Sequence, residues 1–229
     1  MNAQGHDTLR VVILPVTDPA AWGPSLDAAV NALARGEVIV LPTDTMYGIA
    51  ADAFQPSAVD HVREAKGATP DVPLAVLIPS VHTVAGLGSE VPTPAMTLME
   101  ALWPGAITFV VKAQATLAWD LGDTRGTVAL RVPDHPAALS LLKRTGPLAV
   151  SSANRVGEPV ALRATEAHDS LGAAVSVYLD GGVIETGTAS TVVDATKAAL
   201  RIVREGAVSR EVLTGIVGEE AVEPGESAA

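Results

Sequence analysis

The stretch Gly36–Asp52, GEVIVLPTDTMYGIAAD, starts as a strand and then changes character. Its first part, EVIVLP, is short and almost continuously apolar, which is typical of a strand that is covered on both faces. Thr43, Asp44, Thr45 and Tyr47 follow at once. Because ligands of open α/β sheets bind at strand ends, these polar residues predict a binding site. A turn held by local hydrogen bonds to the backbone is the alternative interpretation.

Eight further apolar runs of strand length occur along the chain, with helical periodicity between many of them. The runs are 11–16, 73–78, 106–113, 127–133, 147–153, 175–180, 190–196 and 199–205. The helical segments are 24–36, with Ser25 as the expected N-cap, and 56–67, 93–105, 135–146 and 209–218. This alternation predicts a layered α/β domain around one twisted, mixed sheet. We expect one domain from residue 10 to 218, with flexible tails at 1–9 and 219–229.

The composition restricts the chemistry. Of the 229 residues, 48% are apolar and 18% are charged, so we expect a globular fold. The absence of cysteine excludes disulfides, thiolate nucleophiles and cysteine-ligated metal sites. The five histidines are scattered without metal-ligand spacing, so we predict no metal site. A net charge of −11 disfavours a broad nucleic-acid surface but is compatible with a local basic pocket for a small anion.

The sequence shows no membrane or export signal. No apolar stretch approaches the roughly 18 to 20 residues that a membrane helix needs, and MNAQGHDTLR lacks a basic region followed by an apolar one. We therefore expect a cytoplasmic protein without membrane contact.

Two more polar clusters follow predicted elements in the middle of the chain. Lys66 ends a helical segment, where a lysine can simply favour the helix C-terminus. Ser151, Ser152 and Asn154 crowd the end of the run LAVSSA. Several short hydrogen-bonding side chains at a strand end suit an anionic or amide-bearing ligand.

A last cluster lies near the C-terminus. Ser190 opens one apolar run and Arg204 closes the next. An arginine at a strand end can bind a carboxylate or phosphate with two parallel hydrogen bonds, or it can be a solvated charge.

Several of these segments carry a family resemblance when they are read in order. They are LPTDTMYGIAADAF, AKG before PLAVLI, LWPGAITFVVKA, VALRVPDHP, LAVSSANRVGEP, STVVD and RIVREGAV, and they extend over residues 10 to 210, approximately. Together they resemble the YrdC-like family of L-threonylcarbamoyladenylate synthases. The resemblance implies a three-layer YrdC-like fold, α/β or strictly α+β, with a twisted mixed sheet flanked by helices and a large concave cavity.

The resemblance also implies a reaction. Members of this family combine L-threonine, bicarbonate and ATP, which binds with Mg²⁺, into threonylcarbamoyl-AMP and pyrophosphate. The product supplies the threonylcarbamoyl group of tRNA adenosine 37 through a downstream tRNA-modifying transferase. The implied partners are therefore these substrates and that transferase, with a weak tRNA contact as a further possibility.

The family pattern assigns roles to eight residues. Thr45, Arg131, Ser152 and Ser190 match positions that bind L-threonine. Lys66, Thr108, Asn154 and Arg204 match positions that bind ATP. Lys66, Ser152 and Asn154 are the candidate catalytic residues.

One position departs from the family pattern. The family usually has Lys-x-Arg where this chain has Lys66, Gly67 and Ala68. Another cation, such as Arg63 or Arg155, could replace the missing arginine, or the chain could be a slow or specialised paralogue. The alternatives to a synthase are a non-catalytic nucleotide- or RNA-binding paralogue and a carbamoyl-transfer relative with another acceptor.

Overall fold

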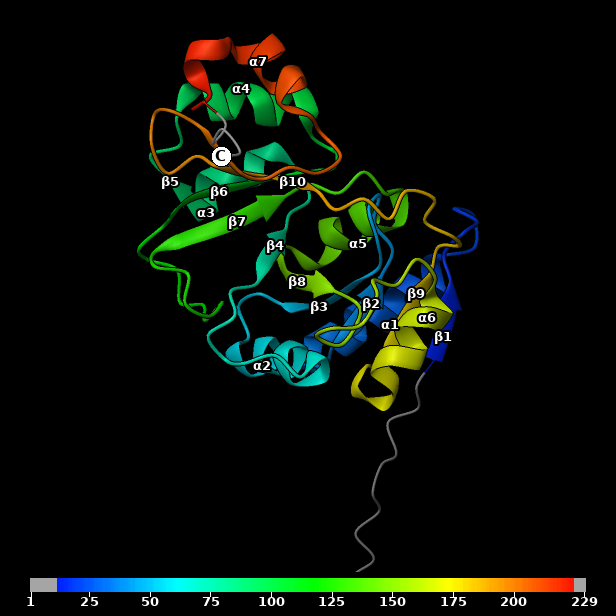
Figure 1. The fold of residues 1–229 in the computed structure, drawn as a ribbon. Coiled ribbons are helices and arrows are strands. Elements are labelled where there is room, and N and C mark those ends of the chain that lie inside the picture. The colour runs from blue at the N-terminus through cyan, green and yellow to red at the C-terminus, as the bar shows by residue number, and fades with distance from the viewer. Residues whose placement is uncertain (1–11, 225–229) are drawn as a thin grey trace, which may run out of the picture.

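The computed structural model describes residues 12–224, which form one mixed sheet with helices on both faces (Figure 1). Ten strands lie in the order β1-β9-β2-β3-β8-β4-β7-β6-β10-β11, and β5 pairs with β6. The strands are β1 Val12–Pro15, β2 Ile39–Leu41, β3 Gly48–Asp52, β4 Ala75–Leu77, β5 Gly88–Ser89, β6 Ile107–Ala113, β7 Thr127–Arg131, β8 Leu148–Ser152, β9 Val177–Asp180, β10 Thr191–Asp194 and β11 Arg201–Arg204.

Seven α-helices and three short 3₁₀ helices connect the described strands. The α-helices are α1 Gly23–Ala34, α2 Pro56–Lys66, α3 Val84–Leu87, α4 Thr93–Leu102, α5 Pro136–Thr145, α6 Ala164–Leu171 and α7 Arg210–Val217. The 3₁₀ helices are η1 Val81–Thr83, η2 Gly172–Ala174 and η3 Glu219–Ala221. Each predicted apolar run contains one strand and each predicted helical segment one α-helix, so the predicted α/β class and mixed sheet are confirmed.

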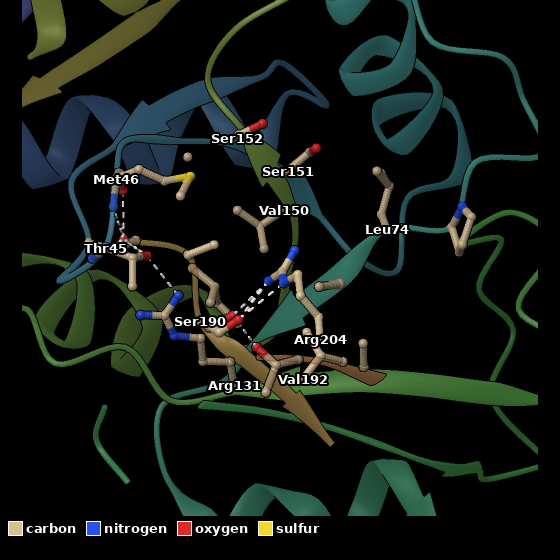
Figure 2. A pocket seen from close by; sticks show the side chains of 18 of the residues that line it. Thr45, Met46, Leu74, Arg131, Val150, Ser151, Ser152, Ser190, Val192 and Arg204 are labelled. Carbon is tan, nitrogen blue, oxygen red and sulfur yellow. Dashed lines mark hydrogen bonds between the residues drawn. The ribbon is translucent and has the colours of Figure 1, made fainter. Parts of the chain in front are cut away.

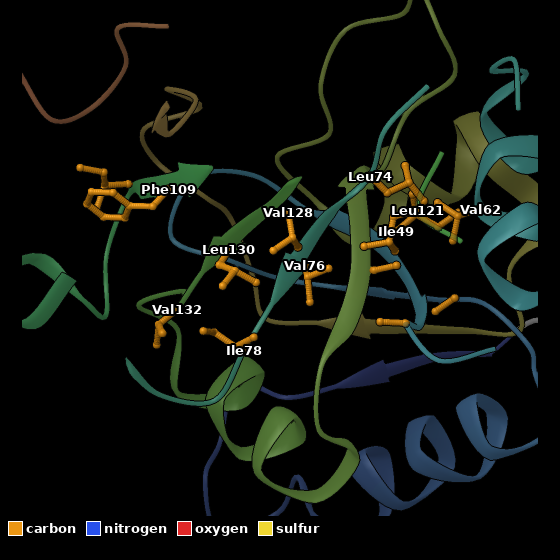
Figure 3. Packing of buried hydrophobic residues seen from close by; sticks show 14 of the residues in the cluster. Ile49, Val62, Leu74, Val76, Ile78, Phe109, Leu121, Val128, Leu130 and Val132 are labelled. Carbon is orange, nitrogen blue, oxygen red and sulfur yellow. The ribbon is translucent and has the colours of Figure 1, made fainter. Parts of the chain in front are cut away.

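The core lies on both faces of the sheet because neighbouring strand residues point in opposite directions. In and just before β2, Val38 and Val40 belong to one buried cluster, while Ile39 and Leu41 belong to the other. Helices α1 and α5 cover the second cluster, and α2, α4, α6 and α7 cover the first, part of which Figure 3 shows. This two-sided burial explains why the strand sequences are almost continuously apolar.

The sequence did not reveal strand β3. Its sequence, GIAAD, contains one β-branched residue, Ile49, and three of its side chains are small or absent. The small residues have a packing reason, since a Cβ atom on Gly48 would lie 2.9 Å from the side chain of Val150 in the neighbouring strand β8. Close strand packing therefore requires small residues here, and these residues have low β-propensity, so the sequence carries no strand signal.

The predicted N-cap at Ser25 is wrong. Helix α1 begins at Gly23 after Trp22, and a proline occupies its first turn. Ser25 lies inside the helix, and its hydroxyl donates a hydrogen bond to the carbonyl of Pro15 at 2.8 Å. A proline near a helix start removes one unsatisfied N–H, so the helix can begin earlier than a serine signal indicates.

The C-terminal boundary also lies beyond the predicted one. Residues 219–221 form η3, and Val222 is 3% exposed and forms a β-bridge with Leu200. Residues 219–224 therefore pack on the domain instead of forming a flexible tail. The N-terminal tail, and the C-terminal residues 225–229, lie outside the described residues.

Strand pairing brings the predicted site residues together. In the antiparallel pair β3 and β8, Gly48 lies opposite Ser152, so the loop of residues 42–47 lies beside the end of β8. Thr108 on β6 and Arg204 on β11 both lie opposite Val192 of β10. Within residues 12–224, no helix has both the length and the apolar character needed to cross a membrane.

Candidate active site

A cavity of about 540 Å³ lies between the loop before β3 and strands β4, β6, β7, β8, β10 and β11 (Figure 2). Its polar wall residues are Thr43, Thr45, Thr108, Asp123, Thr124, Thr127, Arg131, Ser151, Ser152, Ser190 and Arg204. The two wall cations are Arg131 and Arg204, and Asp123 is the acidic residue of the wall. Hydroxyls and guanidinium groups on an otherwise apolar wall favour small polar ligands that carry negative charge.

One side of the cavity is built around Arg131, and we call Asp44, Thr45 and Arg131 the Arg131 side. The guanidinium donates from Nη1 to Thr45 Oγ1 at 2.9 Å and from Nη2 to Asp44 Oδ1 at 2.6 Å. Its Nε donates to the carbonyl of Gly105 at 3.0 Å. Burial lowers the pKa of Arg131, and the negative charge of Asp44 opposes that shift. The arginine is thus fixed in direction and paired in charge.

The loop that carries Thr45 is held by Thr43. The Thr43 hydroxyl donates to the carbonyl of Met46 at 2.6 Å and accepts from the backbone N–H groups of Thr45 and Met46, both at 3.2 Å. The local turn considered from the sequence therefore exists, and it presents Thr45 to the cavity. The two interpretations of this stretch are compatible.

Tyr47, the aromatic residue at the end of the same loop, has a structural role. Its ring is completely buried, and its hydroxyl donates to the carbonyl of Gly182 at 2.6 Å. The hydroxyl also accepts from the N–H of Gly181 at 3.0 Å. Tyr47 therefore ties the loop before β3 to the chain segment that follows β9.

The other side of the cavity is formed by Thr108, Ser190 and Arg204, and we call it the Arg204 side. Arg204 donates from Nη2 to the Ser190 carbonyl at 2.8 Å and to Ser190 Oγ at 3.2 Å. Within the described residues, no carboxylate forms an ion pair with Arg204. Thr108 Oγ1 and Ser190 Oγ share a hydrogen bond at 2.9 Å. Thr108 is predicted to bind ATP and Ser190 to bind L-threonine, so this hydrogen bond would mark the boundary between the two substrates.

Lys66 and Asn154 do not line the cavity, in contrast to the other six predicted site residues. Lys66 is buried, and its Nζ donates to the carbonyls of Ser152 and Asn154 and to Ser152 Oγ at 3.2 Å. Burial lowers the pKa of Lys66 to about 8. Lys66 thus holds the chain at the end of β8, the strand that brings Ser152 to the wall.

Asn154 also makes its contacts outside the cavity. Its Nδ2 donates to the carbonyls of Arg155 at 3.0 Å and Glu158 at 2.8 Å. Its Oδ1 is buried and has no hydrogen-bond partner among the described residues. A buried acceptor without a partner is costly, so this oxygen is available for a donor that the protein itself does not supply.

The two cations considered as replacements for the missing arginine have other roles. Arg63 is buried, donates from Nη1 to Asp60 at 2.7 Å and holds the carbonyl of Val72 through Nε at 3.2 Å. Arg155 donates from Nε to the carbonyl of Ser170 at 2.9 Å. Neither residue lines the cavity in this structure, so neither brings its charge to the wall beside Arg131 and Arg204.

Sequence reasoning missed the role of Asp44, although Asp44 belongs to the polar group after the strand EVIVLP. Its pairing with Arg131 joins residues 87 positions apart, and no local pattern signals such a contact. It also missed Thr124, which reaches the wall from the connection between β6 and β7, and Thr127, the first residue of β7. Thr124 lies in a polar segment between two predicted strands and Thr127 opens the predicted run 127–133, and neither position carried a ligand signal.

Comparison with known proteins gives a consistent picture. The family model Sua5_yciO_yrdC, described as telomere recombination, matches residues 31–206. A Mycobacterium tuberculosis protein is 47% identical over 204 residues, which are 89% of this chain and 94% of that protein. A Bacillus subtilis protein is 35% identical over 216 residues, which are 93% of this chain and 62% of that protein. The names of both relatives include the words threonylcarbamoyl-AMP synthase.

The fold has a solved counterpart with a ligand. The crystal structure of Pyrococcus abyssi Sua5 complexed with L-threonine matches with a TM-score of 0.87 at 30% identity. The match covers 93% of this chain and 63% of the Sua5 chain, so this chain spans less than two thirds of that protein. From the extent of the family match and the identity to full-length relatives, the chain belongs to the Sua5/YciO/YrdC family.

Proposed function

We propose that this protein is an L-threonylcarbamoyladenylate synthase, which converts L-threonine, bicarbonate and ATP into threonylcarbamoyl-AMP and pyrophosphate. One observation carries the proposal: a single cavity contains an arginine whose charge is balanced by Asp44 and a second arginine that has no acidic partner among the described residues. The first suits the single carboxylate of an amino acid, and the second suits a polyphosphate. The names of the relatives give the same reaction.

The reaction requires positioning more than a protein nucleophile. The amino group of L-threonine and bicarbonate form a carbamate with loss of water. A carbamate oxygen then bonds to the α-phosphorus of ATP, the bond from that phosphorus to the β-phosphate bridging oxygen breaks, and pyrophosphate leaves with the electron pair. Such in-line displacements are accelerated mainly by orientation and by charges placed near the developing negative charge. The hydroxyls and guanidinium groups of this cavity are groups of that kind.

In this proposal the Arg131 side and Ser152 hold L-threonine, and Thr108 and Arg204 of the Arg204 side hold the triphosphate. Ser190, the third residue of the Arg204 side, lies at the boundary between the two substrates and contacts L-threonine. Lys66 supplies positive charge at the end of β8, and the unpartnered Oδ1 of Asn154 accepts a hydrogen bond, for which the adenosine of ATP has donors. Movement of Lys66 or Asn154 toward the cavity would be needed for direct contact. The three residues Lys66, Ser152 and Asn154 remain the proposed catalytic group.

Mg²⁺ belongs to this proposal as part of the MgATP substrate. Within the described residues, no three His, Asp or Glu side chains gather into a candidate metal site. The donors present therefore fit a metal ion that arrives on the phosphates, where it screens their charge. The product would pass to a tRNA-modifying transferase, which places the threonylcarbamoyl group on adenosine 37.

Pyrophosphate release by the purified protein tests the proposal. ATP, Mg²⁺ and bicarbonate are supplied with and without L-threonine, beside an Ala68→Arg variant. We expect release that depends on L-threonine. Release without an amino acid requirement would indicate a carbamoyl-transfer relative, and no release from either protein would indicate a binding module.

A further inference from the structure

Asp44 places a negative charge beside the cavity without lining it. Its Oδ1 accepts from Arg131 Nη2 at 2.6 Å and from the backbone N–H of Asp134 at 3.0 Å. The side chains of Asp44 and Arg131 are 17% and 9% exposed. Asp44 is absent from the cavity wall, whereas Arg131 is part of it. Asp44 can therefore act on a ligand through its charge and through the hydrogen bond that orients Arg131.

Arg131 keeps donors for a ligand despite its three protein contacts. A guanidinium group has five N–H donors, and the contacts use Nε and one N–H on each terminal nitrogen. Each terminal nitrogen thus retains one N–H without a partner among the described residues. These two donors match the two oxygens of one carboxylate, while the net charge of the pair with Asp44 is close to zero.

Arg204 presents the opposite combination. Among residues 12–224, the hydrogen-bond partners of its guanidinium are the carbonyl and hydroxyl of Ser190, which are neutral, so no described residue balances its positive charge. Its charge also reaches across the cavity, because Arg204 contributes to lowering the pKa of Arg131. Both arginines would attract a polyphosphate if neither had an acidic partner.

We propose that Asp44 determines which anion each side of the cavity accepts: by cancelling the charge of Arg131, it admits a single carboxylate there and directs polyphosphate to Arg204. This inference rests on the proposed function and makes Asp44 a positioning residue. A polyphosphate gains little from a neutral pair, because its several charges need net positive charge to offset their desolvation. A zwitterionic amino acid needs the paired donors and no net charge.

Calorimetric titration with pyrophosphate tests this inference without turnover. The variant Asp44→Asn keeps an oxygen that can accept from Arg131 and Asp134 but removes the charge. We expect the wild-type protein to bind one pyrophosphate, unaffected by saturating L-threonine. We expect Asp44→Asn to gain a second pyrophosphate site, about tenfold tighter than any second binding to the wild type, that L-threonine displaces.

Two further variants separate charge from fold. Asp134→Asn makes the same change in net charge at an exposed neighbouring residue, and we expect it to bind one pyrophosphate. Asp44→Glu restores the charge, and we expect it to suppress the second site. In kinetics, pyrophosphate should compete with L-threonine in Asp44→Asn only.

Two results would overturn the inference. One is a single pyrophosphate site in a folded Asp44→Asn variant that still binds L-threonine. The other is equal loss of both ligands in Asp44→Asn and Asp44→Glu, which would give Asp44 a purely structural role. If the wild type shows no threonine-dependent pyrophosphate release but the second site appears in Asp44→Asn, the proposed synthase function is wrong. The inference that the charge of Asp44 determines where polyphosphate binds then remains.

Discussion

The Arg131 side and the Arg204 side of the cavity use the same side chain in two different ways. Arg131 is 9% exposed in its side chain, makes three directed hydrogen bonds and pairs with Asp44. Arg204 is exposed, and within the described part of the chain its side-chain hydrogen bonds all go to Ser190. Burial of an unpaired cation strongly destabilises a fold, whereas an exposed cation is solvated by water until a ligand binds. Arg131 should therefore serve both stability and binding, and Arg204 binding alone.

The largest effect is expected for Arg131→Met. Its removal leaves the mostly buried carboxylate of Asp44 without a cation, so we expect the free energy of unfolding to fall by about 3 kcal/mol. Urea unfolding of the variant measures this loss. A change below about 0.5 kcal/mol would mean that the pair contributes nothing to stability and that Arg131 and Arg204 do not differ in this respect. The double variant Asp44→Asn with Arg131→Met, which removes both charges, should recover part of the loss.

We expect Arg204→Met to weaken the binding of ATP and to leave the stability of the fold almost unchanged. We expect the free energy of unfolding to change by less than about 0.5 kcal/mol, because Arg204 is exposed and has no acidic partner among the described residues. Loss of its charge-assisted hydrogen bonds to phosphate should raise the KM for ATP roughly 10- to 100-fold. Steady-state kinetics with ATP varied at saturating L-threonine checks this. An equal rise in the KM for L-threonine would contradict the division of the cavity.

The variant Ala68→Arg adds a cation where the family usually has one. If a phosphate-binding charge is missing from this chain, we expect the KM for ATP to fall about tenfold, equivalent to about 1.4 kcal/mol, with the KM for L-threonine unchanged. Ala68→Gln is the matched control, since it adds length without charge. Equal improvement in both variants would show that charge is not the missing feature.

The smallest effect concerns Lys66. Its pKa of about 8 lies below the ordinary lysine value near 10.4, so the unfolded chain binds more protons than the folded one above pH 8. Stability should therefore rise by about 1 kcal/mol between pH 8 and 10, and this rise should be absent in Lys66→Met. Above pH 10 the buried tyrosines act in the opposite direction, because burial raises the pKa values of Tyr47 and Tyr178. Chemical unfolding at several pH values measures the slope.

Much of the fold could be predicted because its information is local. Two-sided burial makes each strand run apolar, and Gly67 ends α2 in the left-handed conformation that glycine favours. Strand β3 could not be predicted, because Gly48 is required by close contact with Val150 of the neighbouring strand. Such a tertiary contact leaves no local signal in the sequence. Ser25 carried a capping signal that a nearby proline made irrelevant.

The residues of the candidate site also differ in whether local sequence could reveal them. Polar residues at strand ends, such as Thr45 and Arg204, could be found because chain position alone brings a strand end to the cavity. The partner of Arg131 could not, since a salt bridge between Asp44 and Arg131 depends on how distant segments pack. The direction of the Lys66 side chain was equally hidden, because a lysine at a helix end can turn toward a ligand, toward the last carbonyls of its own helix or, as here, toward the carbonyl of a distant residue, Asn154.

Cross-titration of two variants with two ligands tests most directly whether the two arginines bind different substrates. L-Threonine and MgATP are each titrated calorimetrically into wild type, Arg131→Met and Arg204→Met, with circular dichroism confirming that each protein is folded. We predict that Arg131→Met loses L-threonine and keeps MgATP, whereas Arg204→Met weakens MgATP and keeps L-threonine. Loss of the same ligand in both variants, or equal weakening of both ligands in each, would contradict the assignment of the two arginines to two substrates.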